Sequence, residues 1–302
     1  MDGKNLLRLV EKIMNEPSHA LSQILDERTT YDFFYEAAKH WAIETKCLTG
    51  IQEITTVAST AGYTLKGDFL ELYLKHYDEF YVKLYDGTDY HFLTFKPYGD
   101  VYYENDTVAV AIPPHFTLLD DTTLDTLISD TADNAADDVG GKTILTMTAE
   151  VFADVSPGDI IHNTTDGSDG PVVKVTSTKI IEICLFGGTD NEIDANDAFI
   201  IQPRGRMKIQ LVPPPSTEDY TLYVPYVQRP APVYSDYDVY RIFLDYPDAA
   251  AQYVAWKYKY IDKEPNFGDA WYKYWQSRMT QYSALSARAM GKATSSIYPR
   301  IK

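Results

Sequence analysis

The chain has 302 residues, of which 45% are apolar and 24% are charged, with 25 tyrosines and a net charge of −17. This length exceeds an ordinary domain of about 100–200 residues, and the composition excludes a wholly disordered chain. The acidity excludes attachment to DNA or an anionic membrane by bulk charge, because phosphate binding needs clustered lysine and arginine. The aromatic content suggests a large, partly polar surface of the kind that assembly interfaces use.

The N-terminal region has helical periodicity. Leu6, Leu7 and Val10 begin an apolar stripe that Pro17 interrupts, and the stripe is expected to resume from residue 20 to residue 25. Thr30 is a candidate cap for a further helix that carries the apolar residues around Trp41 on one face.

Strand-like alternation begins at Ile51 and continues to the prolines at 113 and 114. Within it, Asp86-Gly87 lies between two alternating segments and predicts a hairpin turn. The candidate strands are Phe69 to Leu74, Phe80 to Tyr85, Tyr90 to Phe95 and Val101 to Ile112.

Residues 119–203 form an acidic block with 3 basic and 17 acidic side chains, a net charge of −14. Residues 1–118 carry −8 and residues 204–302 carry +5, so the block is a candidate inserted module. Its first part, 119–141, is expected to be an exposed loop with at most one short helix. Regularly spaced turn residues then predict a small antiparallel barrel or sandwich. The predicted strands are Thr143 to Thr148, Ile160 to Asn163, Val172 to Val175, Ile180 to Leu185 and Ala198 to Ile201.

After the acidic block, Met207 to Val212 and Tyr220 to Tyr226 alternate as strands, and helical patterns start at Pro247 and Phe267. Strands 51–112 and 206–226 are expected to share one sheet, and the end helices to pack as a bundle. The predicted fold class is α+β: N- and C-terminal helices packed as a bundle, with a central antiparallel β region carrying an inserted small β-barrel module. The predicted domains are 1–118 with 204–290 (helical bundle plus β-sheet), 119–203 (acidic β-barrel) and 291–302 (extended arm).

The aromatic residues of the C-terminal helices suggest subunit contacts. One helical face carries Trp271, Trp275, Met279 and Tyr282, while Tyr272 and Tyr274 fall on other faces. A helix that is aromatic all round is usually covered on several sides, and tyrosine and tryptophan are enriched at interfaces. We therefore favour burial between subunits over a purely intrachain core. The packing residues proposed are Trp41, Trp256, Trp271, Tyr272, Trp275 and Tyr282.

The last twelve residues lose periodicity and are basic. One interpretation is a frayed terminus. The other is an arm that orders on an acidic partner through its apolar residues Ile297, Tyr298 and Ile301. Both interpretations stay open from the pattern alone.

Signatures of catalysis and metal binding are missing from the sequence. There is no phosphate loop, GxGxxG, GxSxG or HExxH, and no histidine lies at ligand spacing from another histidine or a cysteine. The two cysteines, Cys47 and Cys184, are expected to be buried thiols. Acidic pairs such as Asp120-Asp121 could hold calcium, but solvated turns explain them better. We therefore predict no enzyme activity, no cofactor and no metal.

No apolar run approaches the ~20 residues that span a bilayer, and residues 1–10 do not follow a signal-peptide pattern. We therefore expect no membrane association and a product that is cytosolic, at least at first.

The layout resembles the head-to-tail adaptor (connector) proteins of tailed bacteriophages, especially those of short-tailed phages. The acidic block resembles a β-barrel module that recurs in phage structural proteins, through Phe152 to Gly167, Gly187-Gly188 and Asp194 to Asp197. The other features that carry the resemblance are the aromatic helix around Trp41, the strand start Gly62-Tyr63-Thr64-Leu65, the strand Met207 to Val212 with Pro213-Pro214-Pro215, the segment Tyr220 to Tyr226 with Pro230, and the helices with Pro247, Trp256, Trp271 and Trp275.

This resemblance implies a structural virion protein at the head–tail interface, assembled in the host cytoplasm. Copies would form a ring, a dodecamer of 12, that docks on the portal protein, links it to tail nozzle or tail-hub proteins and forms part of the DNA ejection channel. DNA would pass without sequence-specific binding, which an acidic protein suits. The arm would bind the portal through Lys292, Ile297, Tyr298, Arg300, Ile301 and Lys302.

Two other functions remain open. A tail tube or collar protein would use the β region to form the ring. A carbohydrate-binding β module with helical flanks would use clustered exposed tyrosine and aspartate side chains.

Overall fold

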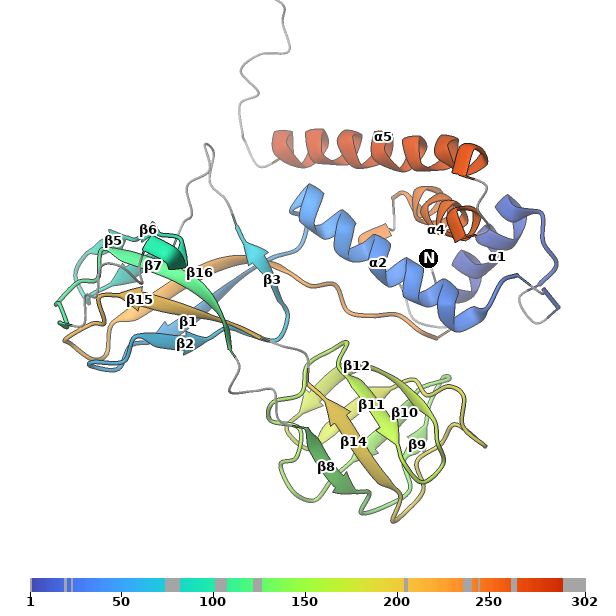
Figure 1. The fold of residues 1–302 in the computed structure, drawn as a ribbon, viewed down its shortest axis with the longest axis horizontal. Helices are drawn as coiled ribbons and strands as arrows, with labels where there is room; N and C mark the ends of the chain where they lie inside the picture. The colour runs from blue at the N-terminus through green and yellow to red at the C-terminus, as the bar shows by residue number, and fades with distance from the viewer. Residues whose placement is uncertain are drawn as a thin grey trace, which may run out of the picture. The chain divides into compact units, whose positions relative to one another are not determined.

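The computed structural model describes residues 2–18, 21–22, 24–73, 82–100, 108–121, 127–203, 206–235, 241–243, 245–261 and 265–289. It divides into two compact units, Met1–Cys47 with Val233–Lys302 and Leu48–Pro232. The first unit holds the helices of both chain ends and the second holds the β structure (Figure 1). The domain boundaries expected from the sequence stay a prediction, and the arm 291–302 lies outside the described residues.

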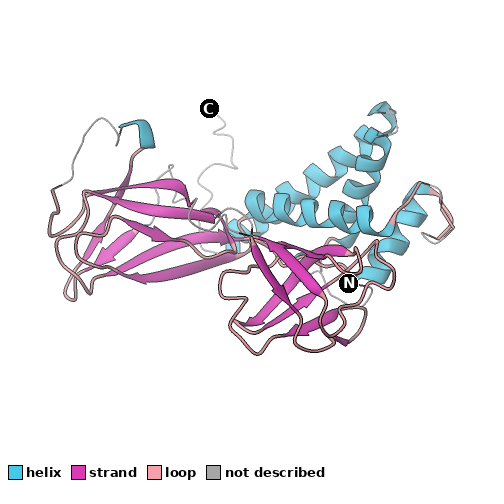
Figure 2. Ribbon diagram, turned by 60° about the horizontal axis from the view of Figure 1, so that its bottom comes forward, coloured by secondary structure: helices cyan, strands magenta, loops and turns pink. Residues whose placement is uncertain are grey.

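The predicted fold class is wrong, because the described chain is mostly β. Its strands number 16 and lie in three sheets of five, seven and four strands (Figure 2). Nor do the helices form a bundle of parallel neighbours: α5 lies across the view of Figure 1 while α4 is seen nearly end-on, so the two cross. The helices described in this unit are α1 (Gly3–Met14), α2 (Glu27–Thr45), the short 3₁₀ helix η2 (Arg241–Phe243), α4 (Pro247–Ile261) and α5 (Pro265–Ala289).

The first two helices are bounded by aspartate caps. Asp2 accepts a hydrogen bond from Asn5 N (2.9 Å), and Asn15 adopts a left-handed conformation that ends α1 before Pro17. Asp26 caps α2 by accepting from Thr29 N (2.8 Å). The predicted cap Thr30 lies inside α2 instead. The expected resumption of a helix from residue 20 to residue 25 is also wrong for the described part of that segment, which is not helical.

Two sheets of the β unit share one core, and the chain crosses from one sheet to the other at Leu93. The five-stranded sheet has the order β1-β16-β4-β5, with β3 also on β16, and the four-stranded sheet has the order β2-β15-β7-β6. The first contains β1 (Thr49–Thr55), β3 (Phe69–Leu72), β4 (Lys83–Tyr85), β5 (Tyr90–Phe92) and β16 (Thr221–Gln228). The second contains β2 (Gly62–Thr64), β6 (Thr94–Phe95), β7 (His115–Asp121) and β15 (Arg206–Val212).

The expectation of a single sheet from 51–112 and 206–226 is therefore wrong. The chain leaves the first sheet after Leu93 N donates to the Val82 carbonyl (3.0 Å), and Thr94 N then donates to the Pro114 carbonyl (2.9 Å) in the second. Inward side chains of both sheets bury one another, including Leu84 and Leu222 from the first and Phe116 and Ile209 from the second. This apolar contact gives the unit its stability.

Pro225 lies in the interior of β16, where proline would normally break a sheet. On one flank, β16 pairs with β4 at 221–223 and with β3 at 226–228. Pro225 falls in the gap between these two partners, so its missing N–H removes no ladder bond. The predicted hairpin at Asp86-Gly87 is confirmed by the pairing of β4 with β5. Of the predicted strand 101–112, residues 101–107 are outside the described part, and Val110 makes only an isolated bridge to Pro215.

The acidic block forms a seven-stranded antiparallel sheet around its own core, in the order β8-β14-β11-β12-β13-β10-β9. The expectation of a loop over 119–141 is wrong, because β7 continues to Asp121 and two further strands follow. All five predicted short strands are present. The strands are β8 (Ile128–Thr131), β9 (Asp137–Asp138), β10 (Thr143–Thr146), β11 (Ile160–Asn163), β12 (Asp169–Ser177), β13 (Ile180–Ile183) and β14 (Ala198–Gln202).

Candidate assembly surface

The outer face of the five-stranded sheet carries aromatic side chains instead of the polar ones that usually face water. Cross-strand partners lie on the same face of a sheet, so the pairings define this surface. Tyr223 lies opposite Glu53 on one side and Lys83 on the other, and Lys83 lies opposite Phe92. We call the outward residues of β1, β16, β4 and β5 the outer face. They are Ile51, Glu53, Thr55, Thr221, Tyr223, Pro225, Lys83, Tyr85, Tyr90 and Phe92.

The aromatic rings of the outer face contact one another and enclose a cation. The ring centroid of Tyr90 is 4.8 Å from that of Tyr85 and 6.0 Å from that of Tyr223. The Lys83 Nζ lies 3.9 Å from the Tyr90 centroid and 5.2 Å from the Tyr223 centroid. Such a contact contributes about 0.5–1 kcal/mol at an exposed site. The lysine is thus held against the rings, and the cluster is ordered before any partner binds.

Much of this apolar surface remains exposed to water. Phe92 is 65% exposed, Ile51 61% and Tyr90 52%. Phe95 and Tyr98, which follow in the chain, are also exposed. Single exposed apolar residues need no explanation, but a contiguous group on one sheet face marks an interaction site. The outer face is therefore the best candidate for a functional surface in the described residues.

The hairpin that presents the outer face is held by one carboxylate. Asp86 accepts hydrogen bonds from the backbone N–H groups of Thr88 and Asp89, both at 2.8 Å, and its other oxygen lies 2.8 Å from His91 Nε2. The bond from Asp89 N, the bond to His91 and the bond from Thr88 N lower the pKa of Asp86 to about 2. Gly87 supplies the positive φ of 98° that the turn requires.

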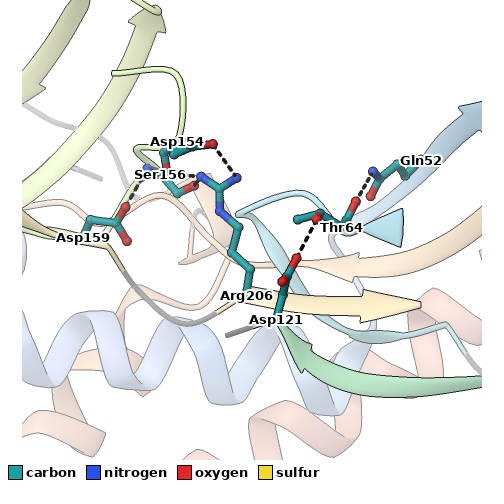
Figure 3. Close-up of polar contacts among 7 residues, drawn as sticks. All are labelled: Gln52, Thr64, Asp121, Asp154, Ser156, Asp159 and Arg206. Carbon is teal, nitrogen blue, oxygen red and sulfur yellow. Dashed lines mark hydrogen bonds and ion pairs between the residues drawn. The ribbon is translucent and has the colours of Figure 1, made fainter. Parts of the chain in front are cut away.

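A second set of contacts ties the acidic module to the four-stranded sheet (Figure 3). Arg206, the first residue of β15, donates to the Asp154 carbonyl and to Ser156 Oγ (3.1 Å). Ser156 N in turn donates to the Asp159 carboxylate (2.7 Å). Beside them, Thr64 donates its hydroxyl to the buried Asp121 carboxylate at 2.5 Å. These contacts position segments of the chain, and they include no nucleophile paired with a base.

Two of the aromatic residues predicted to pack between subunits are buried within the chain. Trp41 and Trp275 have no exposed surface, and their ring centroids lie 4.9 Å apart. Tyr282 lies 5.6 Å from Trp41, and Trp256 lies 4.4 Å from Tyr272, again by centroids. Trp41 and Trp275 therefore belong to the core of the helical unit. The half-buried residues among the six keep some surface for a partner, and these are Trp256, Trp271, Tyr272 and Tyr282.

The predicted portal-binding residues, from Lys292 to Lys302, lie outside the described part of the chain. In the parts that the structure describes, no three histidine, cysteine or acidic side chains gather as a metal site. The acidic turn residue Asp166 accepts a hydrogen bond from the backbone N–H of Thr189 (2.6 Å), so its carboxylate binds a backbone group of the same chain. Across the same described ranges, no helix is both long enough and apolar enough to cross a bilayer.

The predicted arrangement did not include the outer face, although its signal was present. Tyr85, Tyr90 and Phe92 fall at alternate positions on the two sides of the hairpin turn that was predicted. That alternation places them together on one face. The pattern could not indicate which of the two faces is buried, because the opposite face carries Leu84 and Leu93, which are as apolar as the aromatic residues.

No protein-family model matches this sequence, and no curated protein matches it.

Proposed function

We propose that this protein is a structural component of a tailed-bacteriophage virion, a head-to-tail adaptor. Its copies form a ring that docks on the portal protein, links it to tail nozzle or tail-hub proteins and surrounds the path of the DNA. The work of such a protein is adhesion and geometry, so no catalytic residue or cofactor is assigned. The proposal starts from the resemblance described above.

The observation that carries the proposal is the aromatic outer face. An apolar, aromatic and exposed sheet face is typical of a surface that another protein covers. Its rings are ordered by the cation contact of Lys83, and its hairpin is fixed by Asp86. Preorganisation of this kind lowers the entropy cost of association. The net charge of −17 also suits a conduit that must not hold DNA phosphates.

The test is binding to the portal protein of the same virus. The full-length chain, mixed with its portal, is expected to give a complex of several copies per portal ring by mass photometry. A chain that gives no complex under conditions in which the portal ring is intact would remove the proposal. A Phe92→Ser variant tests the outer face directly. It is expected to remain folded but to bind with fewer copies per portal.

A second candidate function, carbohydrate binding, is favoured by one observation. Exposed rings on a sheet face, such as Tyr90 and Phe92, can stack on sugar rings through their apolar faces. Glycan-array binding that the Phe92→Ser variant loses would support this function. Portal binding with no glycan signal would favour the adaptor.

A further inference from the structure

We propose that copies of this protein join edge to edge, with β5 of one copy pairing antiparallel to β1 of the next. The five-stranded sheets would then continue from copy to copy. This inference deepens the proposed function, because it rests on ring formation and names the surface that forms the ring. A contact between two different edges is heterologous, and such contacts close into rings when the rotation between copies allows it.

The first edge is β1, whose unpaired backbone groups can be located from the flanking hydrogen bonds. Thr56 N donates to the Tyr220 carbonyl (2.8 Å), and Gln228 N donates to the Leu48 carbonyl (2.9 Å). Hydrogen bonding alternates along an antiparallel pair, so the even-numbered residues of β1 bond to β16. The odd-numbered ones, including Ile51 and Glu53, direct their N–H and C=O groups away from the sheet. No described strand pairs with β1 on that side.

The second edge is β5, on the opposite side of the same sheet. Asp86 N donates to the Asp89 carbonyl (3.2 Å), and Leu93 N donates to the Val82 carbonyl (3.0 Å). By the same alternation, Tyr90 and Phe92 direct their backbone groups away from β4. Among the strands described, β4 is the one partner of β5. Neither edge has the proline or outward lysine with which proteins usually protect such strands.

The two edges match in direction. Each neighbouring pair along β1-β16-β4-β5 is antiparallel. After four alternating strands, the first and the last run in opposite directions. A second copy placed beside the first in the same orientation therefore offers β1 antiparallel to β5. No strand has to turn over for the two sheets to join.

The two edges also match in the faces of their side chains. The edge-directed residues Tyr90 and Phe92 carry outer-face side chains, and so do Ile51 and Glu53. Residues directly opposite each other in a pair share a face. Pairing would therefore place Ile51 of one copy beside the exposed rings of the next. The outer face of one copy would then be continuous with that of the next, and every apolar side chain would stay on the face that it already occupies.

The match between the two edges selects a second copy as the occupant. Each edge offers the other a strand of the right direction with an exposed apolar side chain on the same face, Ile51 on β1 and Phe92 on β5. Pairing would cover these side chains, which are 61% and 65% exposed. Apolar pairs between neighbouring strands stabilise a sheet.

The test places a charge on each edge of the full-length chain without portal, and association is measured by sedimentation velocity over a range of concentrations. Wild-type protein is expected to self-associate. Ile51→Lys and Phe92→Lys should each weaken association by about fivefold, because a lysine on an edge strand opposes pairing with another chain. An equimolar mixture of the two variants should form dimers, because it retains one unaltered edge of each kind. The matched control Glu150→Lys, an exposed site in the acidic module, should leave association unchanged.

A backbone variant tests the hydrogen bonds separately. Ile51→Pro removes an N–H that points away from β16 and so leaves the intrachain ladder complete. It is expected to abolish self-association while the melting temperature of the monomer stays within a few degrees. Wild-type protein that stays monomeric at its highest soluble concentration would overturn the inference. So would association that neither lysine variant weakens.

The two proposals can fail separately. Portal binding by a chain that never self-associates would overturn edge pairing and leave the adaptor function standing. Self-association that the lysine variants weaken, but without portal binding, would keep edge pairing and remove the adaptor.

Discussion

Replacement of Trp275 tests whether the aromatic helices pack within one chain or between subunits. Trp275 has no exposed surface and lies 4.9 Å from Trp41 and 5.0 Å from Tyr253, measured between ring centroids. Truncation of a fully buried tryptophan costs about 3–5 kcal/mol through lost burial and the cavity left behind. Its Nε1 is buried without a hydrogen-bond partner among the described residues. Trp275→Phe removes that N–H, so we expect a smaller cost of about 1–2 kcal/mol.

The assay is urea unfolding followed by tryptophan fluorescence. All 4 tryptophans lie in the segments 1–47 and 233–302, so their fluorescence reports on the helical unit alone. The control Trp271→Ala removes a half-buried ring and is expected to cost about 1 kcal/mol. Packing within one chain is refuted if Trp275→Ala lowers the free energy of unfolding by less than the control does. It is also refuted if Trp275→Ala leaves the monomer stable and dissociates an oligomer.

Three other predictions follow from the charges and the chain end. The pKa of Asp86 is lowered to about 2 from its ordinary value of 3.8, so hairpin order should be complete above pH 4 and lost as the pH falls toward 2. NMR titration of the Asp86 side chain measures this, and an Asp86 pKa near 4 would contradict it. Burial first, and then the carboxylate of Asp68, raise the pKa of Tyr226 to about 12 from 10.0, so Tyr226 should contribute a fall of about 2–3 kcal/mol in the free energy of unfolding as the pH rises from 10 to 12. Tyr226→Phe should remove this contribution, and an unchanged pH dependence would contradict it. Deletion of residues 291–302 should weaken portal binding with an unchanged melting temperature, and unchanged affinity would reject the arm.

Local turn chemistry made much of the β structure predictable. Asp86-Gly87 predicted the hairpin correctly because a positive φ at glycine is required there. The turn residues of the acidic block separated five strands that the structure contains. By contrast, β9 is Asp137–Asp138, and no hydrophobic period can reveal a strand that is made of two aspartates. It exists because β10 pairs with it.

The fold class was not predictable from local patterns because it depends on long-range pairing. Gly62 pairs with Gln210, far along the chain, and this pairing places β2 in a different sheet from β1. Similarly, the helical stripe of Trp275 indicated a covered face but not what covers it. The structure supplies Trp41 of the same chain as the cover. Periodicity defines which side chains share a face, whereas tertiary contacts decide what that face meets.

The most direct test of edge pairing as the mode of assembly is amide hydrogen exchange in the assembled and dilute protein. The backbone N–H groups of Ile51, Glu53, Tyr90 and Phe92 should exchange rapidly in the monomer, because they point away from their sheet. They should become protected when copies assemble, whereas Leu84, which is already bonded within the chain, should stay slow in both states. Exchange at the four edge residues that is equally fast in the assembled protein would contradict this account.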